Sequence, residues 1–448
     1  MTTASSSSTS PTEKLNARLQ SWKSPQGLNF VSPEVEAGYQ QRAQMVSDAI
    51  LLKKPVRVPV CPNIGFYPFT YAGVTHKEAM YDYDKLGKAL FKFHADFMPD
   101  ALSASPIYGS GKVFEILDYK LYRWPGHGIS EKTPYQCMEA EYMKANEYED
   151  LIQDPSNYFI RAYLPRIFGG LAPWQMLGPA TDVLELPFVA NYLVPLGIPD
   201  VQDSFQKLLE AGREAFKWIQ ACGAIDAAGS GKLGLPPVIG GFTKAPFDTI
   251  GDTLRGTRHV MMDKFNHPSK LLASMEKWVP IAIEMGVRTA TTANNPMVFI
   301  PLHKGADGFL SDKDFRTFYW PSLKAVILGL IEAGTVPWLF VEGGYNQRLD
   351  AIVDHDIPAG RTVWVFDRTD MLQVKKRFTG WACFGGNVPA SLLTTNAPQD
   401  VKDYVKKLYD DVAQDGGFIL STGQVVDDAK AENLHALIEA GKEYGVYN

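Results

Sequence analysis

The feature that most constrains the fold is a series of short apolar runs, each ending near a polar residue and followed by a helical pattern. In the C-terminal part of the chain, such runs begin near residues 337, 361, 380 and 417. Runs that are apolar on both faces are typical of strands buried on both sides in a parallel sheet. Their alternation with helices indicates successive βα units. The pattern fits half of a (β/α)8 barrel, and it fits a doubly wound open sheet as well.

In either architecture, ligands bind at the carboxyl ends of the strands. The residues that close these runs are therefore candidates for a functional site. They are Glu342, Asp367, the turn at 385–387 and the turn at 421–424. A further apolar run at 298–302 ends at His303 and adds a fifth position.

Composition excludes several classes of function. The formal net charge of −6 comes from 44 basic and 50 acidic residues whose signs are well mixed, without the basic stripe that nucleic acid requires. The longest strongly apolar runs, such as 325–331, are far shorter than the roughly 20 residues that span a bilayer. The four cysteines form no CxxC pair, and the polar N-terminus has no signal-peptide core. We expect a cytoplasmic protein without nucleic-acid or membrane partners.

The composition also suggests how the chain is organised. Residues 1–33 are rich in Ser and Thr and predict a disordered or extended tail. Residues 34–448 are expected to form one domain. Residues 158–235 are dense in Pro, Gly and aromatics around a helical stretch at 201–222. We interpret this segment as an added helical elaboration that covers the mouth of the sheet, and barrel helices with irregular loops are the alternative.

Four segments in order carry a resemblance to a known family. They read PPVIGGFTKAPFD (236–248), FLSDKDFRTFYWPSLKAV (309–326), GGNVPASLL (385–393) and GGFILSTGQ (416–424). Together they resemble the uroporphyrinogen decarboxylase superfamily, with a weaker match over 55–100. The resemblance implies an α/β fold, the TIM (β/α)8 barrel, with additional helical elements.

Residues within the matched segments distinguish between branches of that superfamily. Its decarboxylases carry an arginine-rich loop because their substrate holds eight carboxylates. The corresponding stretch here, CPNIGFYPF at 61–69, contains no arginine, and Gln424 stands where those enzymes have a histidine. An apolar, aromatic loop is a poor partner for a polyanion. The sequence therefore disfavours porphyrinogen decarboxylation.

The superfamily's thiol-activating methyltransferases bind zinc through a His-x-Cys pair and a later Cys. The matching positions here are Val341, Gly343 and Gln424, so that zinc site is missing. The resemblance then implies the other half-reaction, in which a methyl group passes from a small donor to Co(I) of a corrinoid. The stretches 340–349 and 365–370 resemble a branch found with corrinoid proteins. Because the chain has no corrinoid-binding Asp-x-His-x-x-Gly stretch, a separate protein is expected to carry the cobalamin.

Glu342 is the leading catalytic candidate. Methyl transfer from an ether or amine needs a proton donor or a metal at the leaving atom, and a carboxyl among aromatic residues has a raised pKa. Asp367 ends the next strand and would stand beside Glu342. The alternatives are a strand-end ion pair of Glu342 with Arg348 or Arg368, and helix capping by Asp367, a role more natural for Asp370.

Three further positions are candidates for metal or substrate binding. His303 suits a metal ligand or a proton shuttle, although a loop histidine without function is the alternative. Should a metal be bound, Zn²⁺ is one candidate, and Glu342, Asp367 and His303 are its candidate ligands. Asn387 and Gln424 lie in glycine-rich turns, where their amides can orient a polar substrate.

An aromatic cluster comprises Phe66, Tyr67, Phe69 and Tyr71. The resemblance places it on a loop that faces the substrate, whereas aromatic clusters in general belong to the core. A pocket of this kind fits an aromatic or otherwise apolar methyl donor. It fits a trimethylammonium group as well.

Three functions follow from these interpretations. The first is a methyltransferase that acts on a small donor together with a separate corrinoid protein. The second is a cofactor-free decarboxylase or lyase of a non-porphyrin acid, and the third is a catalytically silent relative that binds a ligand. Homodimer formation is left open by the sequence.

Overall fold

The core of the molecule is a parallel sheet in a computed structural model that describes residues 9–447. The sheet has six strands in sequence order, β4 to β9, each parallel to the next. They are β4 (Gly241–Phe242), β5 (Met297–Leu302), β6 (Val336–Val341), β7 (Val363–Phe366), β8 (Cys383–Val388) and β9 (Phe418–Thr422). Strands β6, β7 and β9 are buried at every position, as runs apolar on both faces require. The fold class is therefore α/β with a parallel sheet.

The two edges of this sheet are connected by short extended segments rather than by regular strands. Val60 forms a single parallel bridge to Leu420 in β9, and the amide of Asp100 donates to the carbonyl of Val60 at 2.9 Å. Leu102 forms a parallel bridge to Pro237, just ahead of β4. The predicted eight-stranded closure is thus not a continuous ladder in the described chain.

Prolines explain why these segments stay short. Pro59, Pro62 and Pro99 flank the bridging residues, and Pro236 precedes Pro237. Proline has no N–H to donate and is confined to edges and ends of strands. Each segment therefore contributes only two or three backbone hydrogen bonds next to its bridge and then leaves the sheet.

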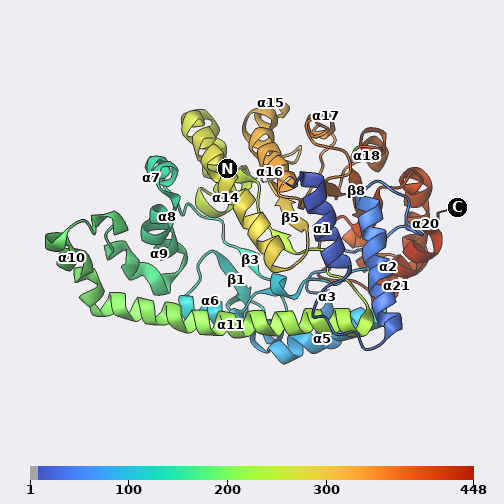
Figure 1. Cartoon of the computed structure of the whole chain (residues 1–448), viewed down its shortest axis with the longest axis horizontal. Helices are drawn as coiled ribbons and strands as arrows, with labels where there is room; N and C mark the ends of the chain where they lie inside the picture. The colour runs from blue at the N-terminus through green and yellow to red at the C-terminus, as the bar shows by residue number, and fades with distance from the viewer. Residues whose placement is uncertain (1–8, 448) are drawn as a thin grey trace, which may run out of the picture.

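Helices alternate with the strands along the C-terminal half and pack on the outside of the sheet (Figure 1). They are α12 (Pro246–Asp248), α13 (Thr257–Asn266), α14 (Pro268–Thr292), α15 (Asp312–Asp314), α16 (Trp320–Glu332), α17 (Leu349–Ile352), α18 (Met371–Phe378), α19 (Ala390–Thr395), α20 (Pro398–Leu408) and α21 (Ala431–Tyr444). The alternation predicted from the apolar runs is confirmed.

The N-terminal segment departs from the expected tail. Residues 1–8 lie outside the described part of the chain, but α1 (Pro11–Lys23) and α2 (Pro33–Ile50) are helices. Leu15, Leu19 and Trp22 on α1 are buried. The tail prediction was wrong for 11–23 because only three large apolar side chains, all of them buried, mark this helix in the sequence. Its signal was present, since Ser10 and Glu13 form a capping box around a proline at the first helical position.

Residues 158–235 are largely helical. They include α9 (Leu164–Ile167), α10 (Leu186–Leu193) and the 35-residue α11 (Pro199–Leu233), which extends well beyond the predicted 201–222. In Figure 1, α11 runs along one side of the body, and α10 sits at the far end of an arm that leads away from the sheet. This placement gives no support to the interpretation that the segment covers the mouth.

A second, smaller sheet lies elsewhere in the N-terminal half. Its strands are β1 (Tyr122–Pro125), β2 (Gly128–Ile129) and β3 (Gln136–Cys137). The remaining helices are α3 (Tyr67–Ala72), α4 (His76–Tyr81), α5 (Tyr83–Phe97), α6 (Gly111–Leu117), α7 (Tyr148–Gln153) and α8 (Pro155–Tyr158). Within residues 9–447, none of the helices combines the length and apolar character that crossing a membrane would need.

Candidate active site

His303 and Glu342 occupy equivalent positions at the ends of two neighbouring strands. Leu302 at the end of β5 pairs with Val341 at the end of β6, so the residues that follow them emerge side by side. The imidazole Nε2 of His303 lies 3.7 Å from Oε1 of Glu342. The strand-end rule thus brings these two predicted residues into contact.

The other ring nitrogen of His303 contacts the carboxylate of Asp252, a residue that the sequence analysis did not predict. Nδ1 of His303 lies 2.5 Å from Oδ2 of Asp252, which belongs to a wide helical turn at Thr249–Leu254. The three side chains form a row in which a histidine is held between two carboxyl groups. An ionised Asp252 fixes the proton of His303 on Nδ1 and leaves Nε2 facing Glu342.

Two lysines keep Asp252 ionised. Nζ of Lys244 is 2.5 Å from Oδ2, and Nζ of Lys304 is 2.9 Å from Oδ1. Burial alone would raise the pKa of Asp252, but the hydrogen bond with His303 and the two lysine charges lower it well below its usual range. Asp252 is therefore a permanent anion behind the imidazole.

The fully buried carboxyl group of Asp248 holds the backbone of His303 and Lys304 by hydrogen bonds. Its oxygens accept the amide N–H of His303 at 3.1 Å and of Lys304 at 2.9 Å, and the hydroxyl of Tyr319 at 2.6 Å. Burial, followed by the nearby charge of Asp252, raises the pKa of Asp248. Asp248 fixes the turn that follows β5, so its role is to position His303.

The pKa values of His303 and Glu342 are both raised above their usual values. Burial lowers the pKa of His303, but the hydrogen bond to Asp252 and the charges of Asp248 and Glu342 outweigh it and raise that pKa. Burial is the main reason that the pKa of Glu342 is raised, although the charge of His303 opposes the rise. Both groups thus hold a proton more strongly than they would in water, and they lie 3.7 Å apart, as an acid–base pair requires.

The row remains open at one end. The side chain of Glu342 is 44% exposed and that of His303 is 34% exposed, whereas Asp252 and Lys304 are largely covered. The two arginines considered as partners of Glu342 are engaged elsewhere. Arg348 is buried beside Asp307, and Arg368 lies 3.7 Å from Asp367. Glu342 is therefore open to solvent at the carboxyl end of β6.

Asp367 follows β7 and is turned toward the backbone. Its Oδ2 accepts the amide N–H of Gly343 at 3.1 Å, and burial raises its pKa. The charge of Asp367 contributes to the raised pKa of Glu342, but less than the charges of Asp248 and Asp252. The expected helix cap is Asp370, whose side chain accepts hydrogen bonds from the amide N–H groups of Leu372 and Gln373 in the first turn of α18.

The two predicted amides behave differently. The Asn387 side chain donates to the carbonyls of Asp367 and Thr369, and its oxygen accepts from the hydroxyl of Tyr404 at 2.9 Å. Its hydrogen-bonding capacity is thus used within the fold. Gln424 is half-buried beside Asp367 and lowers the pKa of that carboxyl by a hydrogen bond. Of the pair, Gln424 is better placed to meet a ligand.

The aromatic residues Phe66, Tyr67 and Phe69 are buried in the core. Phe66 and Phe69 pack edge-on against each other and against Tyr108, and Tyr67 packs on Phe93. The loop before them does lie at the carboxyl end of β9, since Ile64 bridges Val426 there. Their side chains nevertheless fill the structure beneath that loop.

Another segment that the sequence did not mark contacts the site from the N-terminal half. Glu139, just after β3, lies 3.4 Å from Nζ of Lys304 and accepts the amide of Thr257 at 3.0 Å. The charge of Asp252 helps to raise the pKa values of Tyr122 and Cys137, although burial is the larger cause in each. The segment that follows β3 therefore contacts the site through Glu139.

A metal ion finds a poor set of ligands here. Across residues 9–447, no group of three or more His, Cys, Asp or Glu side chains has a geometry that could hold one. Asp252 is already neutralised by two lysines, and Asp367 binds a backbone amide.

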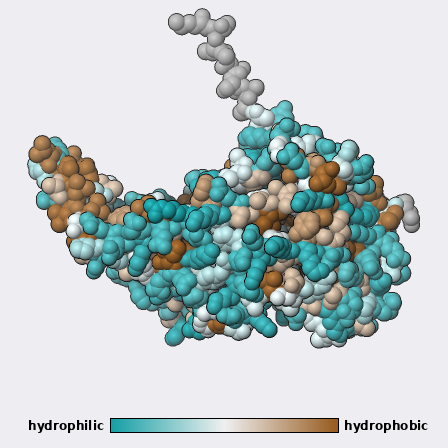
Figure 2. All heavy atoms as spheres, turned by 90° about the horizontal axis from the view of Figure 1, so that it is seen from below, coloured by the Kyte–Doolittle hydropathy of each residue, from teal (hydrophilic) through white to brown (hydrophobic). Residues whose placement is uncertain are grey.

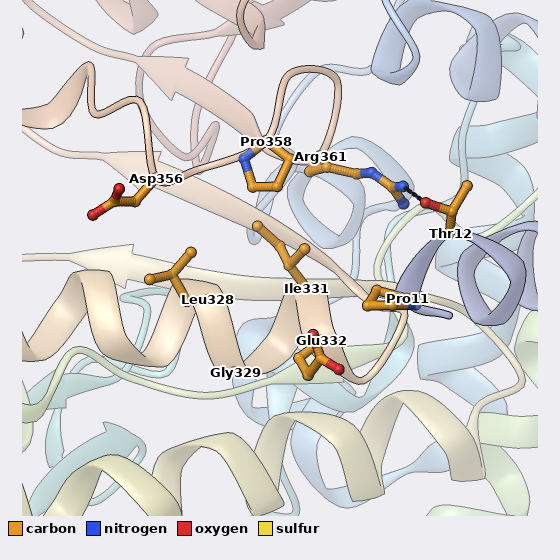
Figure 3. Close-up of a pocket in the computed structure, with 9 residues that line it drawn as sticks. All are labelled: Pro11, Thr12, Leu328, Gly329, Ile331, Glu332, Asp356, Pro358 and Arg361. Atoms are coloured by element: carbon orange, nitrogen blue, oxygen red, sulfur yellow. Dashed lines mark hydrogen bonds between the residues drawn. The ribbon is translucent and has the colours of Figure 1, made fainter. Parts of the chain in front are cut away.

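A separate open pocket lies at the opposite end of the strands. It has a volume of about 530 Å³ between the start of α1, the end of α16 and the loop before β7 (Figure 3). Leu328, Ile331 and Pro358 line it, and Arg361 donates to the hydroxyl of Thr12 at its rim. Because parallel sheets bind ligands at the carboxyl ends of their strands, this pocket is the weaker candidate.

Comparison with known proteins gives a family and a fold. The sequence profile of the family described as uroporphyrinogen decarboxylase (URO-D) matches residues 221–444, half of the chain. The solved structure of a methyltransferase from Methanosarcina mazei aligns with a TM-score of 0.57 and 14% identity over 91% of this chain and 98% of that chain. At this identity the likeness shows the fold alone.

One further solved structure aligns only weakly with this chain. A B12-independent methionine synthase from Shewanella sp. W3-18-1, in complex with selenomethionine, aligns with a TM-score of 0.33 and 12% identity over 45% of this chain and 60% of that chain. That likeness carries no argument. No curated protein sequence matches the chain.

Proposed function

Since the chain belongs to the uroporphyrinogen decarboxylase family, we propose that it is a methyltransferase that moves a methyl group from a small donor to a corrinoid carried by a separate protein. The observation that carries the proposal is the row of Asp252, His303 and Glu342. It places a proton source with a raised pKa at an open strand end. The similar fold of the methyltransferase from Methanosarcina mazei supports the same reaction class.

The chemistry assigned to this chain is activation of the leaving atom. When the methyl–oxygen or methyl–nitrogen bond breaks, the electron pair of that bond remains on the heteroatom. Glu342 donates a proton to that atom, and His303, with Asp252 behind it, replaces the proton on Glu342. The corrinoid, when its carrier protein is bound, supplies the reduced cobalt that accepts the methyl group.

The structure fits a methyl acceptor that arrives from outside. Glu342 and His303 are the partly exposed members of the row, so a partner protein can reach the substrate bound against them. The other charged residues behind His303 are paired with one another, since Lys244 and Lys304 both contact Asp252. Asp367, beside Glu342, supports its raised pKa.

The same charges argue against a porphyrinogen substrate. A polyanion with eight carboxylates needs several free cations. The two lysines of the site, Lys244 and Lys304, are both bound to Asp252, and the 61–69 loop has no arginine. The site therefore offers a large anion little to bind.

We also infer that the fold is the (β/α)8 barrel. The bridges at Val60 and Leu102 supply the two positions that the six-stranded sheet lacks, in the order that closure requires. In such a barrel the carboxyl ends of all strands converge on one mouth. This geometry supports the placement of the site at His303 and Glu342.

The proposal is tested with the purified full-length chain and free cob(I)alamin as methyl acceptor. Candidate donors are methoxylated aromatics, methylamines and quaternary methylammonium compounds, and methylcobalamin formation is followed by absorbance. We expect at least one donor class to be demethylated, with no reaction when cob(I)alamin is omitted. Release of CO2 from a small acid without any corrinoid, or full demethylation without a corrinoid, contradicts the proposal.

A further inference from the structure

The arm at residues 180–198 carries an apolar helix that packs on little of its own chain. Every residue of α10 is at least partly exposed, and Leu186 is 88% exposed. Its large exposed apolar side chains are Leu186, Phe188, Val189 and Leu193, continued on either side by Val183, Leu184, Val194 and Leu196. Figure 2 shows hydrophobic residues gathered at the end of this arm. A helix that is apolar around its circumference is normally a buried one.

The helix that carries the arm has a second apolar stripe. Residues such as Ala211 and Cys222 form its buried face against the body. Leu209, Phe216 and Ile219 lie on another face and are exposed, with Phe216 63% exposed. Together with glycines at 212 and 223 they are spaced three and four residues apart in alternation, which is the spacing of a helix–helix seam.

The two glycines in this stripe have no explanation within one chain. Glycine in a helix interior costs about 1 kcal/mol relative to alanine. A Cβ built at Gly212 or Gly223 meets nothing within 4 Å among the described residues. Close approach of another helix would explain why side chains are missing there.

We propose that a second copy of this chain covers the stripe, with α11 antiparallel to α11 of the partner subunit. In this register Phe216 enters the gap at Gly212 of the partner subunit, and Leu209 packs on Ile219 of the partner subunit. Both pairings are centred on Glu214, so one twofold axis satisfies them together. Such a contact is isologous and closed, as in most homodimers.

The same axis accounts for the arm. It sets Pro199, where α11 begins, beside Gly229 of the partner subunit, so that α10 reaches the partner's body. The apolar side chains of arm and stripe expose an area on the order of 600 Å² per copy, from about 100 Å² for each fully exposed side chain. Two copies together then reach the roughly 1,000 Å² that a specific interface needs.

Charge argues against a membrane as the occupant. Interfacial helices combine an apolar face with many Lys and Arg. Residues 180–198 contain no Lys or Arg, and they contain Asp182 and Glu185. A negatively charged lipid surface would repel this arm, whereas a second copy offers it an apolar face.

The first test measures the mass of the full-length chain by sedimentation velocity at micromolar concentrations. We expect twice the 49.7 kDa of one chain for the wild type. Phe216→Glu buries a charge at the axis and is expected to raise the dimer dissociation constant by about 30-fold or more. Phe265→Glu, at a 77% exposed position on α13, is the matched control and should leave the dimer intact.

The second test checks the register in a Cys137→Ser background, because Cys137 is the exposed native cysteine and the other three are buried. The double variant Leu209→Cys/Ile219→Cys should give a covalent dimer on mild oxidation. Leu209→Cys alone should not, because its two copies lie about 15 Å apart along the helices.

Four outcomes overturn the proposal. Three concern the dimer: a wild-type monomer at all concentrations, a dimer that Phe216→Glu leaves unchanged, and cross-linking of the single variant that is as efficient as that of the double variant. The fourth is binding of a monomer to vesicles of anionic or neutral phospholipid through the arm.

Discussion

The two sides of the strand-end edge use their polar side chains in different ways. After β5 and β6, His303 and Glu342 lie next to each other and next to charged side chains. Just after β7, Asp367 forms a hydrogen bond with a backbone group, and near the end of β8 the side chain of Asn387 does the same. Both sides were expected to carry function, since both end buried parallel strands.

This difference in partners indicates that one side of the edge can carry out proton transfer and that the other side supports the structure. A carboxyl group that accepts a backbone amide is held in place but has little reason to exchange its proton. A carboxyl group beside an imidazole has a pKa that depends on the imidazole's charge, and each group responds to the other. We therefore assign the acid–base chemistry to the β5–β6 side and a supporting role to the β7–β8 side.

The largest effect is expected at Glu342. Glu342→Gln keeps the shape and removes the acid, so turnover should fall by about 10² to 10⁴ while thermal stability changes little, because Glu342 is half-exposed. The measurement is kcat with the best methyl donor, together with a melting curve. Glu284→Gln, an exposed glutamate on α14, is the matched control.

This prediction is open to a clear contradiction. If Glu342→Gln folds normally and keeps more than about a tenth of wild-type turnover, general-acid catalysis by Glu342 is wrong. The acid would then have to be His303 itself, or lie in the 421–424 turn.

The next effect concerns the pH profile. Asp252→Asn removes the hydrogen-bonded anion that raises the pKa of His303, so that pKa falls, although the charges of Asp248 and Glu342 remain. Activity that needs protonated His303 is lost as pH rises through its pKa. The alkaline limb of kcat/KM should therefore move to lower pH, with a loss of about 10- to 100-fold at neutral pH.

For Asp252→Asn, both the pH of the alkaline limb of kcat/KM and the rate at neutral pH are measured. A purely structural role for Asp252 would lower the rate and leave the limb where it was. Lys402→Met, at an exposed ion pair far along the chain on α20, should leave both unchanged.

A smaller effect, on stability rather than on rate, is expected at Asn387. Asn387→Ala leaves the carbonyls of Asp367 and Thr369 without the amide that donates to them, while the hydroxyl of Tyr404 keeps only its weaker acceptor, the backbone carbonyl of residue 387. Unfolding free energy should fall by about 1–3 kcal/mol, with kcat of the folded enzyme within threefold of wild type. The check is denaturant unfolding beside kinetics. A large loss of kcat at unchanged stability would place Asn387 at the substrate.

Sequence predicted the sheet well where strands are long and missed it where they are short. The runs near 337, 361, 380 and 417 became β6 to β9, because burial on both faces leaves a continuous apolar signature. Val60 and Leu102 join the sheet through single bridges among prolines, and one or two residues carry no periodicity. The α1 helix was missed because three large apolar residues in a polar segment are a weak periodic signal, and only the capping box at Ser10 and Glu13 marks its start.

The site was half predictable for a related reason. His303 and Glu342 follow from the rule that ligands meet strand ends. Asp248 and Asp252 lie four residues apart in a helical turn that folds back onto the end of β5, and only tertiary packing brings them there. Glu139 comes from a distant segment through an ion pair with Lys304, which no local pattern marks.

The smallest effect is expected at Asp367, on the β7–β8 side to which we assign a supporting role. Asp367→Asn keeps an oxygen that can accept the amide of Gly343, so the turn should hold. It removes a negative charge that helps to raise the pKa of Glu342, so that pKa should fall slightly and the alkaline limb should move slightly to lower pH. Because Asp248 and Asp252 contribute more to that pKa, the loss of kcat should stay below about tenfold, under one pKa unit of interaction. The measurement is the full kcat/KM profile of Asp367→Asn beside that of Glu342→Gln. Equal losses in the two variants would mean that both carboxyl groups act on the substrate, and the division between the two sides of the edge would be wrong.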